Sequence, residues 1–153
     1  MLSPGSTYTE EFPAAAESVP RARAEVTCFA QAAGADSHQL DSIRLAASEA
    51  ITNIVQHAYR GGRGTFQVVA SYVPNELWLL IGDDGVGLQR QGRRARGGLG
   101  LGLVLIAQLA DDFEIVRRST GGTQLQMRFK LKGTDESVSG RPKGRKATSL
   151  SPA

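Results

Sequence analysis

Two stretches in the first half of the chain repeat their apolar residues at the spacing of an amphipathic helix. The first begins near Ser18, which we expect to be its cap, and ends at Gly34. The second begins near Ser37 and is stopped by the glycine pair 61–62. The apolar stripe of the second consists of Leu40, Ile43, Ala47, Ile51, Ile54 and Ala58. The pattern predicts two helices that each bury one face.

The other patterned segments are typical of strands. Residues 7–12 alternate weakly, which predicts a short edge strand, and residues 66–72 and 123–131 alternate clearly between apolar and polar side chains. The run 77–81 is apolar throughout, which predicts a strand buried on both faces. Residues 113–117 form a further predicted strand, and the glycine pair 121–122 a turn before the last one.

Between these strands lies a loop, 82–100, followed by an apolar segment of helical length, 101–110. The order is therefore β-α-α-β-β-loop-α-β-β. Because short turns join the late strands, we expect a mixed, mostly antiparallel sheet with about three helices on one face. The predicted fold class is α+β, a two-layer α/β sandwich. We expect one domain over residues 1–132.

Composition and charge narrow the possible functions. The chain of 153 residues has 41% hydrophobic and 22% charged residues, which is typical of a globular protein. Its net charge of +3 includes +2 from residues 133–153, so the remainder carries only +1. That segment is rich in Gly, Ser and Pro, which predicts a disordered basic tail. We therefore expect no direct nucleic-acid binding.

The chain shows no apolar run long enough to span a bilayer and no secretory leader, so we expect no membrane association. Its single cysteine, Cys28, excludes an internal disulfide. A reducing, cytoplasmic location is the expectation.

Glycine is unusually concentrated in one segment. Of 18 glycines in the chain, 8 fall between residues 82 and 102. Glycine costs conformational entropy in a packed domain, so such a cluster indicates a functional requirement on the backbone. Two motifs share the cluster.

The first motif, Asp83-Asp84-Gly85-Val86-Gly87, directly follows the apolar strand. A carboxylate at the end of a buried strand can accept a hydrogen bond from an exocyclic amine such as that of adenine. Gly85 and Gly87 would let the backbone turn sharply beside a flat ring. The alternative interpretation is an ordinary Asp-Gly turn.

The second motif, Gly97-Gly98-Leu99-Gly100-Leu101-Gly102, leads into the third predicted helix. Free N–H groups at a helix start favour an anion. Four arginines precede it, Arg90, Arg93, Arg94 and Arg96, which together suggest a lid over phosphates. A flexible solvated loop is the alternative. The chain has neither a P-loop nor a G-x-G-x-x-G motif.

A carboxylate and an amide lie four residues apart on the second helix, Glu49 and Asn53. They share one helix face, away from the apolar stripe. A carboxylate could act as a general base and an amide oxygen could ligate Mg²⁺. The alternative is that they only form the polar side of an amphipathic helix.

Taken in order, the segments 48–59 (SEAITNIVQHAY), 83–88 (DDGVGL), 98–113 (GLGLGLVLIAQLADDF) and 121–123 (GGT) resemble the ATP-binding boxes of the gyrase, heat-shock chaperone, histidine-kinase and mismatch-repair ATPase superfamily. Within it, the chain is most similar to the small anti-sigma-factor serine/threonine kinases of bacteria. The resemblance covers about residues 7 to 131. It implies a Bergerat-type ATP-binding fold, the cofactors ATP and Mg²⁺, and a protein serine/threonine kinase activity.

The resemblance also implies roles for individual residues. Glu49 would be the general base, Asn53 would hold Mg²⁺, and Asp83 would anchor adenine. The other nucleotide-binding positions that it implies are Gly85 and Gly87 in the adenine pocket, Gly98, Gly100 and Gly102 beside the phosphates, and Thr123 near adenine. In the kinase subgroup an arginine often stands where this chain has Gly98, and Arg96 is the nearby candidate to replace it.

The implied partners are a sigma factor and an anti-sigma-factor antagonist protein whose serine is phosphorylated, with the kinase as a homodimer. The glycine at position 98 leaves a second hypothesis open, an ATP-gated partner-binding module with little or no kinase activity.

Overall fold

A five-stranded antiparallel sheet is the frame on which the protein is built, in a computed structural model that describes residues 1–59, 63–85, 99–119 and 121–132. The strand order is β1-β2-β3-β5-β4, and all four pairings are antiparallel. The strands are β1 (Thr7–Pro13), β2 (Thr65–Val73), β3 (Glu76–Asp83), β4 (Asp112–Arg117) and β5 (Thr123–Lys130). The predicted antiparallel arrangement, with residues 7–12 at the edge, is confirmed, but the described sheet contains no parallel pair and so is not mixed.

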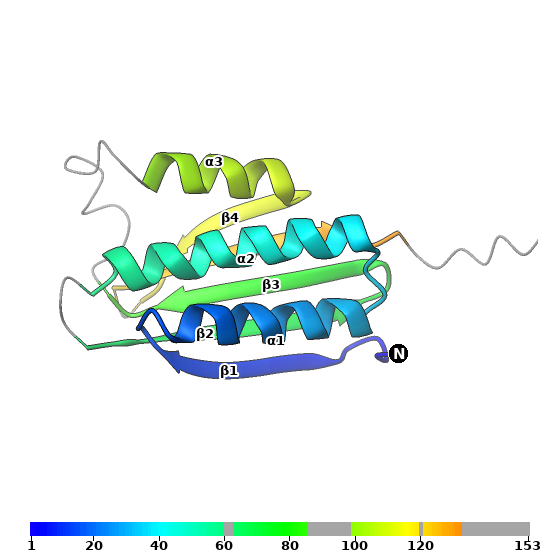
Figure 1. Ribbon diagram of the computed structural model, residues 1–153, viewed down its shortest axis with the longest axis horizontal. Helices are drawn as coiled ribbons and strands as arrows, with labels where there is room; N and C mark the ends of the chain where they lie inside the picture. The colour runs from blue at the N-terminus through cyan, green and yellow to red at the C-terminus, as the bar shows by residue number, and fades with distance from the viewer. Residues whose placement is uncertain (60–62, 86–98, 120, 133–153) are drawn as a thin grey trace, which may run out of the picture.

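Three helices of the described chain cover one face of this sheet: α1 (Ser18–Ala32), α2 (Ser37–His57) and α3 (Leu99–Leu109). Figure 1 shows them side by side in front of the strands, with α2 between the other two. The predicted two-layer α/β architecture is therefore confirmed, with helices on one face only.

The start of α1 differs from the prediction. Ser18 is the first residue of the helix and not its cap, and the residue before it, Glu17, has helical backbone angles with φ −64° and ψ −25°. A side-chain cap needs an extended backbone at the capping residue, so neither side chain can cap. The end agrees with the prediction, because Gly34 adopts a φ of +95° just after the helix.

The start of α2 is held by a capping box that the sequence analysis did not identify. Asp36 has an extended backbone, and its Oδ1 accepts a hydrogen bond of 2.8 Å from the Gln39 N–H. The Gln39 Oε1 in turn accepts a hydrogen bond of 3.0 Å from the Asp36 N–H. This reciprocal pair satisfies two backbone donors at the helix start and fixes where α2 begins.

Removal of this cap in Asp36→Ala is expected to lower the free energy of unfolding by about 1 kcal/mol. Urea unfolding followed by circular dichroism measures it. The matched control is Asp41→Ala, which removes an exposed acid of the same helix that pairs with Arg44, at 3.0 Å. The control is expected to change the free energy by less than about 0.5 kcal/mol. Equal losses in the two variants would show that the cap contributes nothing.

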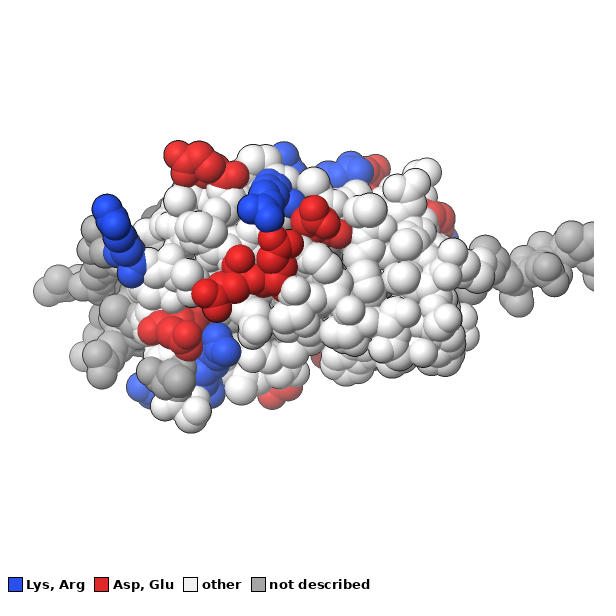
Figure 2. Space-filling model, turned by 90° about the horizontal axis from the view of Figure 1, so that it is seen from below, with Lys and Arg blue, Asp and Glu red and all other residues white. Residues whose placement is uncertain are grey.

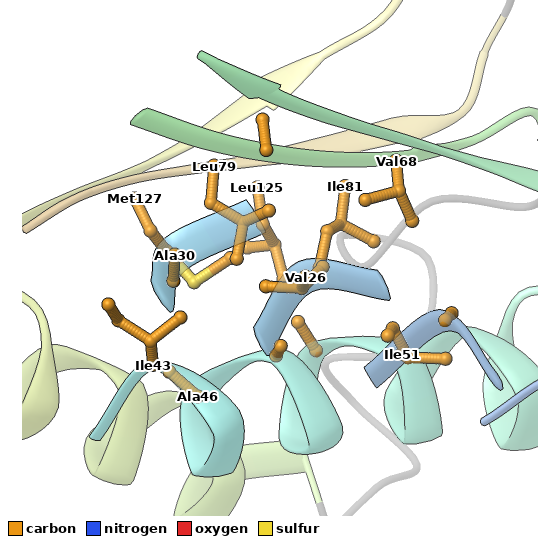
Figure 3. Close-up of a cluster of buried hydrophobic side chains, with 14 of the residues drawn as sticks. Val26, Ala30, Ile43, Ala46, Ile51, Val68, Leu79, Ile81, Leu125 and Met127 are labelled. Carbon is orange, nitrogen blue, oxygen red and sulfur yellow. The ribbon is translucent and has the colours of Figure 1, made fainter. Parts of the chain in front are cut away.

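The hydrophobic core lies between the helices and the sheet. Figure 3 shows side chains of α1, α2, β2, β3 and β5 pointing toward one another across this layer. The labelled ones are Val26, Ala30, Ile43, Ala46, Ile51, Val68, Leu79, Ile81, Leu125 and Met127, all of them buried. The core thus joins α1 and α2 to the three central strands and fixes where the ends of these elements lie.

The prediction that the run 77–81 is buried on both faces is wrong. Leu77, Leu79 and Ile81 are fully buried on the helix side, but Trp78 and Leu80 are only half-buried on the helix-free side. The Arg128 guanidinium lies 5.9 Å from the Trp78 ring centre and covers it in part. An apolar run can therefore arise where long polar side chains replace a second layer of helices.

Candidate functional site

One end of the molecule collects the ends of the elements that carry the predicted site residues. Figure 1 shows the end of α2, the start of α3 and the end of β3 at the same side of the molecule. The start of β5 lies there too, because Gly82 at the end of β3 pairs with Gln124. The fold therefore brings together segments that are up to 74 residues apart, from Glu49 to Thr123.

Glu49 and Asn53 converge on the first turn of α3. A methyl group built on Gly102 would lie 3.2 Å from Asn53 Nδ2 and 3.2 Å from Glu49 Oε2. The prediction that the two side chains share one face of α2 is confirmed by this common neighbour. Because Gly102 has no side chain, the first turn of α3 can pack closely against the carboxylate and the amide.

The alternative interpretation, that the two residues only form the polar side of an amphipathic helix, does not fit Asn53. Asn53 is only 7% exposed, because α3 packs over that part of α2. Its Nδ2 is buried and has no hydrogen-bond partner among the described residues. A buried amide donor without a partner costs free energy, which is typical of a group that acts on a ligand.

The start of α3 lies two residues earlier than predicted. The helix begins at Leu99, so Gly100, predicted to end the preceding loop, belongs with Gly102 to the first helical turn. The N–H groups of a first helical turn have no partner within the helix, and the helix dipole favours negative charge beside them. The first turn of α3 therefore presents its N–H groups at the end of the molecule that also holds Glu49 and Asn53.

Asp83 ends β3 as a buried carboxylate, only 5% exposed. Its Oδ1 accepts a hydrogen bond of 2.8 Å from the Gly85 N–H, and the Thr123 N–H also bonds to it. Burial raises the pKa of the Asp83 carboxyl above its usual value of 3.8, and these two N–H groups partly oppose the shift. Thr123, itself buried, thus lies beside the predicted adenine anchor.

Two glycines let neighbouring segments approach this carboxylate closely. A methyl group on Gly85 would lie 2.1 Å from the Ala58 carbonyl oxygen at the end of α2. A methyl group on Gly122 would lie 1.8 Å from the Asp83 carbonyl oxygen. Both distances are far below van der Waals contact, so only glycine fits at these positions. The structure thus gives Gly85 a packing reason that its turn motif did not predict.

Two residues of this end were not predicted to be functional. The Tyr59 hydroxyl accepts a hydrogen bond of 2.9 Å from the Asp84 N–H, and the Arg118 Nη1 lies 3.5 Å from Asp84 Oδ1. Tyr59 closes the helical segment 48–59, but nothing in its spacing indicated a contact with residue 84. The predicted residues Gly87 and Gly98, and the four predicted lid arginines, Arg90, Arg93, Arg94 and Arg96, lie outside the described residues.

Adding a side chain at Gly102 is expected to weaken nucleotide binding without a comparable loss of stability. In Gly102→Ala, the new methyl group contacts both Glu49 and Asn53, so the affinity for Mg-ATP is expected to fall at least about tenfold. The same change should alter thermal stability little, because the gain of about 1 kcal/mol for alanine over glycine inside a helix is opposed by the crowding of the buried Asn53. Calorimetric titration and thermal unfolding measure the two effects. An unchanged affinity for Mg-ATP would show that the nucleotide does not bind beside residue 102.

The raised pKa of Asp83 predicts a pH-dependent cost to stability. A carboxyl whose pKa is higher in the folded than in the unfolded chain binds its proton more tightly when folded. The free energy of unfolding therefore falls as the pH rises from the usual carboxyl range through the raised pKa. Asp83→Asn lacks this loss, so it should gain stability relative to the unchanged protein as the pH rises above the usual carboxyl pKa of 3.8. Urea unfolding at a series of pH values measures the difference, and a constant difference would contradict the shift.

The surface of the β1 side carries charges of both signs. Figure 2 shows acidic side chains gathered along the middle of this face, with basic ones beside them rather than a continuous basic surface.

None of the described helices combines the length and the apolar character that crossing a bilayer requires.

Residues 12–129 match the family of the histidine kinase-like ATPase domain. The chain therefore belongs to that family.

Several proteins of known name are similar to this chain. A serine-protein kinase RsbW of Bacillus cereus is 32% identical over 132 residues, which cover 78% of this chain and 82% of that protein. The serine-protein kinase RsbW of Bacillus anthracis matches equally well, and that of Bacillus thuringiensis is 31% identical. A crystal structure of the RsbU and RsbW domains of a Mycobacterium tuberculosis protein has the same fold, with a TM-score of 0.64 and 22% identity. The match covers 84% of this chain and about a third, 33%, of that one.

Proposed function

We propose that the protein is an ATP-dependent protein serine/threonine kinase and an anti-sigma regulatory factor that phosphorylates a serine of an antagonist protein. The observation that carries the proposal is the convergence of Glu49 and the buried Asn53 on the first turn of α3. Membership of an ATPase-domain family and similarity to serine-protein kinases over most of the chain support it.

Glu49 is the residue best placed to act as the general base. Its carboxylate lies beside Gly102, close to the N–H groups of the first turn of α3. The serine hydroxyl of the substrate would give its proton to the Glu49 carboxylate as its oxygen bonds to the γ-phosphorus. The bond between that phosphorus and the β-γ bridging oxygen breaks, and ADP leaves. The first-turn N–H groups of α3 would stabilise the negative charge of the phosphates.

Asn53 fits the role of the Mg²⁺ ligand. Its side-chain amide is buried, and its Nδ2 makes no hydrogen bond with the described residues, so the nitrogen serves no structural bond there. The Oδ1 would be the atom that binds the metal. Carboxylate or amide oxygens and phosphates are the ligands that Mg²⁺ prefers. Among the described residues, no cluster of three or more His, Cys, Asp or Glu could hold a metal. Bound Mg²⁺ would neutralise charge on the phosphates, and Asn53 would supply its protein ligand.

Asp83 would hold the adenine base. Its ionised carboxylate would accept a hydrogen bond from the exocyclic amine, with Gly85 and Thr123 fixing its orientation by their N–H groups. Gly87 would complete the adenine pocket. Gly98, Gly100 and Arg96 would act on the phosphate side.

The proposal includes the partners that the resemblance implies. The protein would act in the cytoplasm as a homodimer, holding a sigma factor in one state and the antagonist in another. Phosphorylation of the antagonist would release it and free the kinase for the sigma factor. Candidate sigma factors and antagonists are those encoded by neighbouring genes.

Native mass spectrometry of the protein mixed with these candidates and Mg-ATP tests the exchange. The expected result is a sigma-factor complex that the unphosphorylated antagonist disrupts and the phosphorylated antagonist does not. Indifference of the sigma-factor complex to both forms would contradict the anti-sigma role. The alternative, an ATP-gated binding module, is favoured by glycine at position 98 and predicts exchange without phosphoserine.

A further inference from the structure

Asp84, the residue after the proposed adenine anchor, is held from two sides. Its N–H donates a hydrogen bond of 2.9 Å to the Tyr59 hydroxyl, which itself donates one of 2.6 Å to the Thr65 carbonyl oxygen. Its carboxylate Oδ1 lies 3.5 Å from the Arg118 Nη1. That guanidinium nitrogen also lies 3.5 Å from the Asp83 carbonyl oxygen. The end of β3 is thus tied to the end of α2 and to the β4–β5 turn.

Both ties depend on a glycine that leaves room for the larger side chain. A methyl group on Gly64 would lie 2.3 Å from the ring of Tyr59. A methyl group on Gly82 would lie 3.0 Å from the Arg118 Nη1 and 3.5 Å from its Cζ. The tyrosine ring and the guanidinium therefore each fill a space that these backbone positions leave open, which holds the two side chains in place.

Arg118 approaches from the side of the sheet opposite the helices. Gly82 follows Trp78 and Leu80 at alternate positions of β3, so all three belong to the helix-free face. Asp83 belongs to the opposite face, with its carboxylate bonded to the N–H groups of Gly85 and Thr123. The Arg118 guanidinium therefore approaches the Asp83 carbonyl oxygen from the helix-free face of the sheet.

We propose that Tyr59 and Arg118 are positioning residues that fix the Asp83–Gly85 turn and thereby set the preference for adenine over guanine. The inference rests on the proposed nucleotide site. Adenine offers an amine donor where guanine offers a carbonyl acceptor. A carboxylate held in a fixed position accepts a hydrogen bond from the adenine amine and repels the guanine carbonyl oxygen. A loosely held carboxylate distinguishes the two bases less. The phosphate contacts are the same for both nucleotides.

The experiment compares the dissociation constants of ATP and GTP, measured by calorimetric titration with Mg²⁺, for Arg118→Met and Tyr59→Phe. Each change removes one tie and keeps most of the side-chain volume. We expect the ATP constant to rise about five- to tenfold and the GTP constant to stay nearly unchanged, so that their ratio narrows. Arg118→Lys, which keeps the charge, should restore most of the ratio.

Matched controls remove the same groups elsewhere. Arg128→Met removes an arginine of the same sheet face that pairs with Glu76 at 3.0 Å, and Tyr72→Phe removes a hydroxyl of β2. Both control variants should keep the ratio of the ATP and GTP dissociation constants that the unchanged protein has. Equal weakening of ATP and GTP in the test variants would reveal a merely structural role and overturn the inference, as would an unchanged ratio. If the unchanged protein binds no ATP, the proposed function fails, and the inference with it.

Discussion

Replacing the Glu49 carboxylate by an amide (Glu49→Gln) is expected to lower the rate of phosphoryl transfer by roughly two to four powers of ten, the usual range for a lost general base. The amide has nearly the same shape but cannot take the serine proton. Single-turnover transfer to the antagonist protein, at saturating Mg-ATP, measures the rate of the chemical step.

The affinity for Mg-ATP should change less than about threefold in Glu49→Gln, because the carboxylate acts on the hydroxyl and not on the nucleotide. Glu114→Gln is the matched control, since it neutralises an exposed acid on β4, far along the sheet from α2. It should transfer at the unchanged rate. Full transfer by the Glu49 variant would exclude this residue as the base.

Truncating the buried amide in Asn53→Ala is expected to abolish most of the Mg²⁺-dependent part of ATP binding, a loss of at least about tenfold. The amide supplies the proposed protein oxygen for the metal. Its Nδ2 is buried without a partner in the described chain, and such a donor costs about 1–3 kcal/mol, which offsets the packing lost on truncation. The thermal midpoint of the nucleotide-free variant should therefore fall little or not at all.

Titration of ATP with Mg²⁺ and with a chelator separates the two contributions. The affinity without metal should be nearly the same in Asn53→Ala and in the unchanged protein. Gln56→Ala, an exposed residue of the same helix, is the control and should keep the full metal effect. A metal effect that persists in the Asn53 variant would show that another group ligates Mg²⁺.

The elements of the fold followed from the sequence because their periodicity and their punctuating residues agreed. Gly34 and Ser37 lie where one helix ends and the next begins, and alternation located β2 and β5. The predictions were wrong where one sequence pattern can have two different physical causes. An apolar run such as 77–81 can be covered by helices or by long polar side chains, and Ser18 can precede a helix or begin it.

The site could be predicted only as far as contacts are local or resemble a known motif. Glu49 and Asn53 were placed on one helix face by their spacing, but the burial of Asn53 depends on α3, which lies far along the chain. The reason for glycine at 85 is the carbonyl of Ala58, and at 122 that of Asp83. Such approaches between distant segments leave no periodic signal. The contacts that Tyr59 and Arg118 make with Asp84 also join segments that lie far apart in the sequence, so no periodic pattern indicated them.

The most direct test of the proposed kinase is intact-protein mass spectrometry of candidate antagonist proteins after incubation with Mg-ATP and this chain. The prediction is the addition of one phosphoryl group to a single serine of one antagonist, with no addition by Glu49→Gln or without ATP. ATP binding by the chain together with unmodified antagonists would contradict the kinase, and would leave the protein as a nucleotide-gated binding module.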